Sequence, residues 1–270
     1  MAEGNTIVIL TDALTRPLGR KVLNGINHLG AATIFLGKAL GSIFRSKQLL
    51  ATLEQIYYIG ATSTSIVMLV GLFTGMVLGL QLHYTLVKFG SEGALGSAVA
   101  LSLVREMGPV LTAIMVAARA GSSMAAEIGI QRISEQIDAL HTMRIEPLRY
   151  LVSPRIAAAV ISFPLLTAFF DLIGIFGGFL SGVLLLGGDP GIYLFRVESS
   201  IEWEDVSGGF IKSLVFALVV ATICCYQGYF THLRGDSQGA KSVSLSTTSA
   251  VVLSCVFVLI ADYVVTSLLM

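Results

Sequence analysis

Charged residues stand inside apolar stretches of this sequence that are long enough to cross a lipid bilayer. Residues 99–118 read VALSLVREMGPVLTAIMVAA, in which Arg105 and Glu106 are adjacent. Three more charges stand in other such stretches: Asp171, Lys212 and Asp262. A charge in the hydrocarbon is costly, and it usually faces a bundle interior or a water-filled cavity and has a partner. These residues are therefore expected to face the interior of the bundle or a water-filled cavity and to have charged partners.

Arg105 and Glu106 cannot neutralise each other, because side chains that meet on a helix lie three or four positions apart. Each therefore needs a partner elsewhere. The sequence contains no G-x4-G-K-[ST] phosphate loop, no H-E-x-x-H and no G-x-S-x-G motif, and its four histidines and three cysteines have no metal-binding spacing. If a nucleotide drives transport or chemistry here, another chain must bind it.

The composition indicates an all-α integral membrane protein. Of the 270 residues, 54% are hydrophobic and 13% are charged, and the mean hydropathy is +0.82, whereas about 25% of residues are charged in a soluble domain. The net charge of zero provides no basic surface for nucleic acid. About 20 apolar residues cross the ~30 Å hydrocarbon core. The segments that reach this length are 57–82, 94–118, 156–187, 209–231 and 246–269.

Lysine and arginine are unevenly distributed between the connections. Six precede the first span, five lie at or between spans two and three, and two join spans four and five, whereas the other side has only Lys88 and Arg196. The positive-inside rule therefore predicts a cytoplasmic N-terminus and a cytoplasmic 119–155 connection. The 188–208 loop and the C-terminus are predicted to lie outside.

The segment 28–44 is apolar, but it is short and is interrupted by Lys38 and three glycines. We predict an amphipathic helix in the cytoplasmic interface rather than a sixth span, because a sixth span would turn the basic N-terminus outside. Residues 1–50 then form an N-terminal cytoplasmic or interfacial segment, and 51–270 form the transmembrane domain. Gly-x3-Gly-x3-Gly ladders at 71–79 and 174–182 favour close helix packing within one bundle over a subunit interface.

A helix rises about 1.5 Å per residue, so the depth of each charge below the outer membrane surface can be estimated from its position in the span. Charges at similar depths are the more favourable partners. Arg105 lies roughly 15–18 Å below the outer surface, Asp262 roughly 10 Å and Lys212 about 5 Å. We predict that Glu106 pairs with Lys212. Arg105 is predicted to pair with Asp262, so that three helices surround a cavity that opens outward. The alternative is that the charges only hold the helices in register. Asp171 is assigned no function.

The stretch EIGIQRISEQIDALHTM at 127–143 lies in the cytoplasmic connection between spans two and three. Its apolar residues recur at helical spacing: Ile130, Ile133, Ile137 and Leu140. Its charged residues are Glu127, Arg132, Glu135 and Asp138. The pattern predicts a short amphipathic helix. Because its charge is mixed rather than basic, a groove of a cytoplasmic protein is favoured over the membrane surface as its binding partner.

The stretch LSLVREMGPVLTAIMVAARAGSSMAAEIGIQRISEQIDALHTMRIEPLRYLVSPR resembles the signature region of the MlaE/YrbE permeases, the membrane subunits of MCE-type ABC lipid transporters. The similarity extends from GLFTGMVLGLQ at 71–81 through GGFIKSLVFA at 208–217 to the last span, and it is weakest over residues 1–50. It implies a homodimeric phospholipid permease of the bacterial inner membrane, not an enzyme, with five spans and an N-terminal interfacial helix in each subunit.

The resemblance also implies partners. In that family the permease works with two cytoplasmic ABC ATPase subunits, a periplasmic hexamer of MCE-domain proteins and, in many members, a STAS-domain protein. ATP and Mg²⁺ are expected on the ATPase, with no cofactor on this chain. The 127–143 segment matches the coupling helix that docks on the ATPase.

Residue by residue, the resemblance matches four charged positions to the family's lipid-translocation cavity: Arg105, Glu106, Lys212 and Asp262. It places three apolar residues near bound lipid: Leu78, Phe89 and Met107. An ion-coupled secondary transporter of an amphipathic substrate is the alternative, against which stand the odd number of spans and the lack of an inverted repeat. The direction of movement, the lipid class and the presence of a STAS partner stay open.

Overall fold

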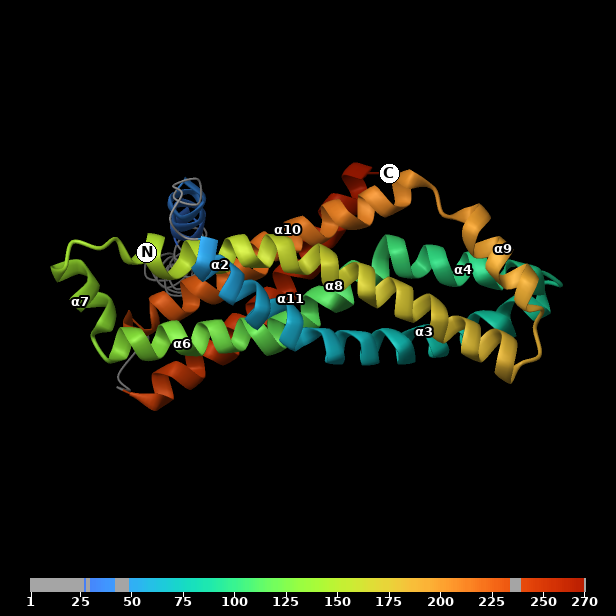
Figure 1. Cartoon of the computed structure of the whole chain (residues 1–270), viewed down its shortest axis with the longest axis horizontal. Helices are drawn as coiled ribbons and strands as arrows, with labels where there is room; N and C mark the ends of the chain where they lie inside the picture. The colour runs from blue at the N-terminus through green and yellow to red at the C-terminus, as the bar shows by residue number, and fades with distance from the viewer. Residues whose placement is uncertain (1–26, 28–29, 42–48, 234–238, 270) are drawn as a thin grey trace, which may run out of the picture.

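Five long apolar helices run along the long axis of an elongated bundle (Figure 1). This computed structural model of the chain describes residues 27, 30–41, 49–233 and 239–269. The long helices cover Leu49–Lys88, Glu92–Ile133, Leu148–Leu185, Trp203–Tyr229 and Ala240–Leu269, which confirms the five predicted spans. The shortest of the first three has 38 residues, and its length of about 57 Å exceeds the ~30 Å hydrocarbon core.

Wide π-helical turns interrupt the first three spanning helices. The first consists of α2 (Leu49–Ile56), the π turn Tyr57–Ala61 and α3 (Thr62–Lys88). The second contains α4 (Leu95–Ser102), α5 (Gly108–Val116) and α6 (Ser122–Ile133), with π turns at Leu103–Met107 and Ala117–Gly121. In the third, α8 (Ser153–Phe179) lies between the π turns Leu148–Val152 and Leu180–Leu185. Single π turns inside α-helices are frequent at functional sites.

The fourth and fifth spanning helices are the uninterrupted α10 (Trp203–Tyr229) and α11 (Ala240–Leu269). Two short helices mark the ends of the bundle: α7 (Gln136–Thr142) at one end and α9 (Pro190–Ser200) at the other (Figure 1). We refer to these as the α7 end and the α9 end. At the start of α9, the Asp189 carboxylate accepts a hydrogen bond of 3.0 Å from the backbone N–H of Ile192, which caps the helix.

An apolar helix over Gly30–Gly41 lies across the α7 end of the bundle (Figure 1). Phe35 is buried among the rings of Tyr226, Tyr229 and Phe230. The described helix is about 18 Å long and therefore too short to cross the bilayer, and within the described residues the spans number five, as predicted. The ends of the predicted 28–44 segment and most of residues 1–50 lie outside the described residues.

The glycine ladders bring α3 and α8 of the same chain into close contact. A Cβ atom on Gly75 would lie 1.8 Å from the backbone oxygen of Gly174, and one on Gly71 would lie 2.9 Å from that of Phe170. No larger residue fits at Gly75 without separating the two backbones, which is how small residues operate in membrane helix packing. The ladders therefore serve packing within one bundle, as predicted.

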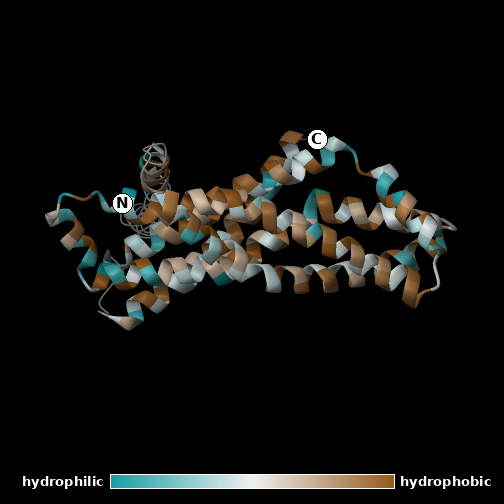
Figure 2. Cartoon of the chain, viewed as in Figure 1, coloured by the Kyte–Doolittle hydropathy of each residue, from teal (hydrophilic) through white to brown (hydrophobic). Residues whose placement is uncertain are grey.

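The core and the outer surface are both apolar, as expected for a protein whose solvent is lipid. Phe163 and Phe170 of α8 are completely buried, together with Phe216 of α10. Side chains that repeat every fourth residue of α3 point outward instead: Leu69, Phe73 and Val77. Figure 2 shows hydrophobic residues along the whole length of the bundle and hydrophilic ones concentrated at its two ends.

Candidate functional site: a charged pocket between three spanning helices

The adjacent residues Arg105 and Glu106 stand in the π turn Leu103–Met107. Pro109, two residues after the end of this turn, has no backbone N–H and therefore cannot donate the hydrogen bond of a regular helical turn. The N–H of Gly108 donates instead to the carbonyl of Leu103, five residues before it. The wide turn that results carries both charges toward α10.

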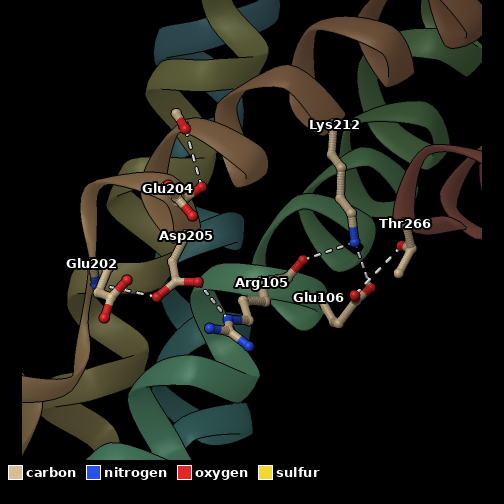
Figure 3. A network of polar contacts seen from close by, with 8 residues as sticks. Arg105, Glu106, Glu202, Glu204, Asp205, Lys212 and Thr266 are labelled. Carbon is tan, nitrogen blue, oxygen red and sulfur yellow. Dashed lines mark hydrogen bonds and ion pairs between the residues drawn. The ribbon is translucent and has the colours of Figure 1, made fainter. Parts of the chain in front are cut away.

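Helix α10 comes close to this turn because residue 209 is glycine. A Cβ atom there would lie 2.7 Å from the backbone oxygen of Val104. One turn further along α10, the Lys212 side chain reaches the second spanning helix (Figure 3).

Lys212 uses its ammonium group to connect the second, fourth and fifth spanning helices. Its Nζ donates to Glu106 Oε2 at 2.7 Å and to the backbone oxygen of Arg105 at 2.9 Å. The same Nζ lies 3.3 Å from Asp262 Oδ1 on α11. The predicted Glu106–Lys212 pair is confirmed. Lys212 is only 2% exposed, and a buried ammonium needs such partners because removing it from water is costly.

The predicted Arg105–Asp262 pair is wrong. Arg105 Nε instead donates to Asp205 Oδ1 at 2.6 Å, while Asp262 joins Glu106 around Lys212. Asp205 Oδ2 accepts from the backbone N–H of Glu202 at 3.1 Å, so that the same carboxylate also caps α10 (Figure 3).

Sequence reasoning missed Asp205 because it assigned residues 188–208 to a loop. In the structure α10 begins at Trp203, so Asp205 lies in its first helical turn. The adjacent acidic residues Glu204 and Asp205 before an apolar run are typical of a first helical turn and could have placed the helix start. An earlier start would have counted Asp205 among the charges of the fourth spanning helix and made it a candidate partner of Arg105.

The charged residues line a pocket of about 190 Å³. Its walls come from the second, fourth and fifth spanning helices, the three that the predicted pairs would connect. The lining residues are Arg105, Glu106, Glu204, Asp205, Gly208, Gly209, Lys212, Thr266 and Leu269. Thr266 donates to Glu106 Oε1 at 3.4 Å. The pocket therefore combines ionic groups with small and apolar side chains.

The three apolar residues predicted near lipid do not line this pocket. Leu78 packs against the core from α3. Phe89, just after α3, is 77% exposed, and Met107 in the π turn is 41% exposed. Both exposed side chains remain available to lipid.

The predicted helix at 127–143 is two helices. Its first half continues the second span as α6, which ends at Ile133, and α7 begins at Gln136. Glu135 between them has φ +59°, a left-handed conformation that breaks the helix. The break removes the predicted common face, since Ile130 is exposed whereas Ile137 is fully buried.

Arg132 bridges the break between α6 and α7. Its Nη1 lies 2.7 Å from Asp138 Oδ1, and its Nε donates to His232 Nδ1 at 3.0 Å. Burial and the neighbouring Arg132 guanidinium lower the pKa of His232 below its ordinary value. Leu140 is partly buried against the core. It also lines an apolar pocket of about 280 Å³ beside α7 with Gln131, Gln136, Ile137, Ala139, Met143, Tyr150 and Leu151.

Glu127, predicted on the docking helix, points into the bundle instead. Its Oε2 accepts from Arg155 Nη2 at 2.9 Å, and Arg155 is only 5% exposed. Its Oε1 accepts from Ser123, which also hydrogen-bonds Tyr58. This second charged cluster joins the first three spanning helices near the α7 end.

Asp171 also faces the second span. Its Oδ1 lies against Gly108 and is buried without a hydrogen-bond partner among the described residues. Within the same part of the chain, no group of three or more histidine, cysteine or acidic residues is arranged to hold a metal ion. The charged pocket therefore remains the candidate site.

Comparison with known proteins identifies the family. A sequence profile described as Permease MlaE matches residues 52–268. The intermembrane phospholipid transport system permease protein MlaE of Haemophilus influenzae is 40% identical over 254 residues, which cover 93% of this chain and 95% of that protein. A probable ABC transporter permease protein of Rickettsia felis is 38% identical over 256 residues, 94% of this chain and 97% of that protein.

A more distant relative is the chloroplastic protein TRIGALACTOSYLDIACYLGLYCEROL 1 of Arabidopsis thaliana, which is 35% identical over 216 residues, 80% of this chain and 60% of that protein. The matched region contains all but the first three residues and the last residue of the five spanning helices, and every lining residue of the charged pocket except Leu269. The chain therefore belongs to the MlaE family of permeases.

Proposed function

We propose that this chain is the membrane-spanning subunit of an ABC transporter that moves phospholipid between the bacterial inner membrane and a periplasmic conduit of MCE-domain proteins. The observation that carries the proposal is the charged pocket inside a five-span MlaE-family permease. A phospholipid has an ionic head and two apolar chains. The pocket provides ionic partners for the head, and the apolar surfaces of the surrounding helices accept the chains.

An ATPase partner is expected to bind at the α7 end. The apolar pocket beside α7 and the exposed Met143 at its rim support a docking surface there. ATP and Mg²⁺ would be held by that partner. Binding and hydrolysis of ATP would move α7, and the Arg132–Asp138 contact would transmit the movement to the second spanning helix, which carries Arg105 and Glu106.

A second copy of the chain is expected to complete the transporter. Helix α11 exposes apolar side chains next to the pocket, including Leu259 and Tyr263, and family resemblance supports a homodimer. The MCE-domain hexamer would then lie at the α9 end, and a STAS-domain protein is a further candidate partner. The distribution of lysine and arginine supports a cytoplasmic N-terminus and a periplasmic C-terminus.

The test is lipid transfer in a reconstituted system. The chain, its ATPase and its MCE protein are placed in vesicles with a fluorescent phospholipid, and its transfer to the MCE protein or back is followed with and without ATP. ATP-dependent transfer that is lost in Lys212→Met and kept in Lys241→Met is the expected result. Transport by the chain alone under an ion gradient, without ATP, would instead establish an ion-coupled carrier.

A further inference from the structure

The pocket has more acidic than basic side chains. Arg105 and Lys212 face three lining carboxylates, those of Glu106, Glu204 and Asp205, which leaves one formal negative charge. Asp262, which contacts Lys212 from behind, adds another. The excess of carboxylates would repel a lipid head with net negative charge, but it would not repel a head that carries its own cation.

Burial and its partners turn Lys212 away from a ligand. Its Nζ donates to Glu106 and to the Arg105 carbonyl at 2.7 and 2.9 Å, and it forms an ion pair with Asp262 Oδ1 at 3.3 Å. The side chain is almost completely buried. It therefore holds the walls of the pocket together and does not bind the head.

Arg105 is the cation that remains for a phosphate. Only its Nε is occupied, by Asp205, and its two Nη groups make no hydrogen bond with the described residues. Its side chain is 48% exposed, whereas that of Asp205 is 8% exposed. Asp205 thus fixes the guanidinium from behind and leaves the paired Nη donors for a bidentate contact with phosphate oxygens.

Glu204 provides the opposite charge at the same pocket. It lies in the first turn of α10 next to Asp205, is exposed, and its carboxylate has no hydrogen bond or ion pair with the described residues. Figure 3 shows Glu204 and Arg105 on either side of Asp205. A head that extends from Arg105 to Glu204 across the pocket would place its phosphate on the first and its cation on the second.

We propose that the pocket selects a zwitterionic phospholipid head that carries a primary amine, with the phosphate on Arg105 and the ammonium on Glu204, over a head with net negative charge. This inference rests on the proposed function. The pocket volume of about 190 Å³ equals about six water molecules at ~30 Å³ each, which accommodates a phosphate and a short amine but not the acyl chains.

The experiment measures which lipid the full-length chain retains. Purified protein is equilibrated with mixed micelles that contain equal amounts of phosphatidylethanolamine and phosphatidylglycerol with identical acyl chains, and retained lipid is quantified by mass spectrometry. We expect about two- to fivefold enrichment of phosphatidylethanolamine, the range that a partly exposed ion pair provides. In Glu204→Gln the ratio should fall toward one, and in Glu204→Lys it should reverse.

Glu198→Gln is the matched control, because Glu198 is an exposed acidic residue near the same end that does not line the pocket. It should keep the wild-type ratio. Equal retention of both lipids by the wild type, or equal loss of selectivity in Glu198→Gln and Glu204→Gln, would overturn the inference while leaving phospholipid transport intact. Retention of neither phospholipid would contradict the proposed function itself.

Discussion

Replacing Lys212 with methionine should destabilise the bundle more than replacing either of its acidic partners. Methionine keeps most of the volume of the side chain but removes the cation that Glu106 and Asp262 share. Two carboxylates would then face each other between the second, fourth and fifth spanning helices without a counter-charge. The Arg105 carbonyl would also lose its hydrogen bond.

The expected cost follows from burial. Removing one partner of a buried ion pair costs about 3–5 kcal/mol. Lys212 is buried, but the side chains of Glu106 and Asp262 are 40% and 21% exposed, so water relieves part of the charge. We therefore expect about 3 kcal/mol for Lys212→Met, and about 1 kcal/mol for Glu106→Gln because its carboxylate is half-exposed.

The assay is equilibrium unfolding of the purified chain in mixed micelles, followed by helical circular dichroism. Lys241→Met is the control, because Lys241 stands in the first turn of α11 and its side chain is exposed. The free energy of unfolding of this control variant should lie within about 0.5 kcal/mol of the wild-type value.

A double-mutant cycle tests the reasoning directly. Lys212→Met combined with Glu106→Gln removes one of the two uncompensated carboxylates. The free energy of unfolding lost in this double variant should therefore be smaller, by at least about 1 kcal/mol, than the sum of the losses in the two single variants. Adding Asp262→Asn should recover more. Additive losses would refute the claim that Lys212 stabilises the bundle by neutralising these carboxylates.

Three further predictions concern other parts of the fold. Gly75→Ala should cost at least about 3 kcal/mol in the same assay, because its Cβ would lie 1.8 Å from a backbone oxygen, whereas Gly37→Ala, with open space around it, should be nearly neutral. Glu135→Gly should preserve the α6–α7 break and raise stability by about 1 kcal/mol, because glycine adopts φ +59° without strain; a loss of stability would contradict this. Because the pKa of His232 is lowered in the folded state, the unfolded chain binds the proton more readily, so stability should be retained above about pH 6.5 and fall below it. His232→Gln should reduce that fall, and an unchanged pH profile would exclude His232 as its source.

The pairing of Glu106 with Lys212 was predictable from the opposite signs of the two charges and from their position in the outer half or midplane of the predicted spans. The pairing of Arg105 was not, because depth was measured from a helix start that lay six residues too late. Because α10 begins at Trp203, Asp205 belongs to the fourth spanning helix and pairs with Arg105, whereas Asp262 pairs with Lys212. The misplaced start of this one helix is thus the reason why Asp262, rather than Asp205, was predicted as the partner of Arg105.

The break at Glu135 was missed for a different reason. Apolar spacing over residues 127–143 matches one helical face, and nothing in the local pattern predicts a left-handed backbone at a glutamate. The break is stabilised by contacts that come from elsewhere in the chain, including the bond between Arg132 and His232. Glu127 turns inward for the same reason, since its partner Arg155 belongs to the next spanning helix.

The amino-acid sequence alone establishes that this chain has five segments able to cross the membrane, which charged residues lie inside them, and which family the chain resembles. These properties follow from the length and composition of continuous segments, because a lipid solvent requires each spanning helix to be apolar and to satisfy its own backbone. The packing of the helices, in contrast, determines that Lys212 is buried among its partners while the Nη groups of Arg105 have no hydrogen bond with the described residues. That distinction depends on the rotation and separation of helices whose contacting residues are 100 or more positions apart in the chain. Close packing at positions such as Gly209 sets this separation.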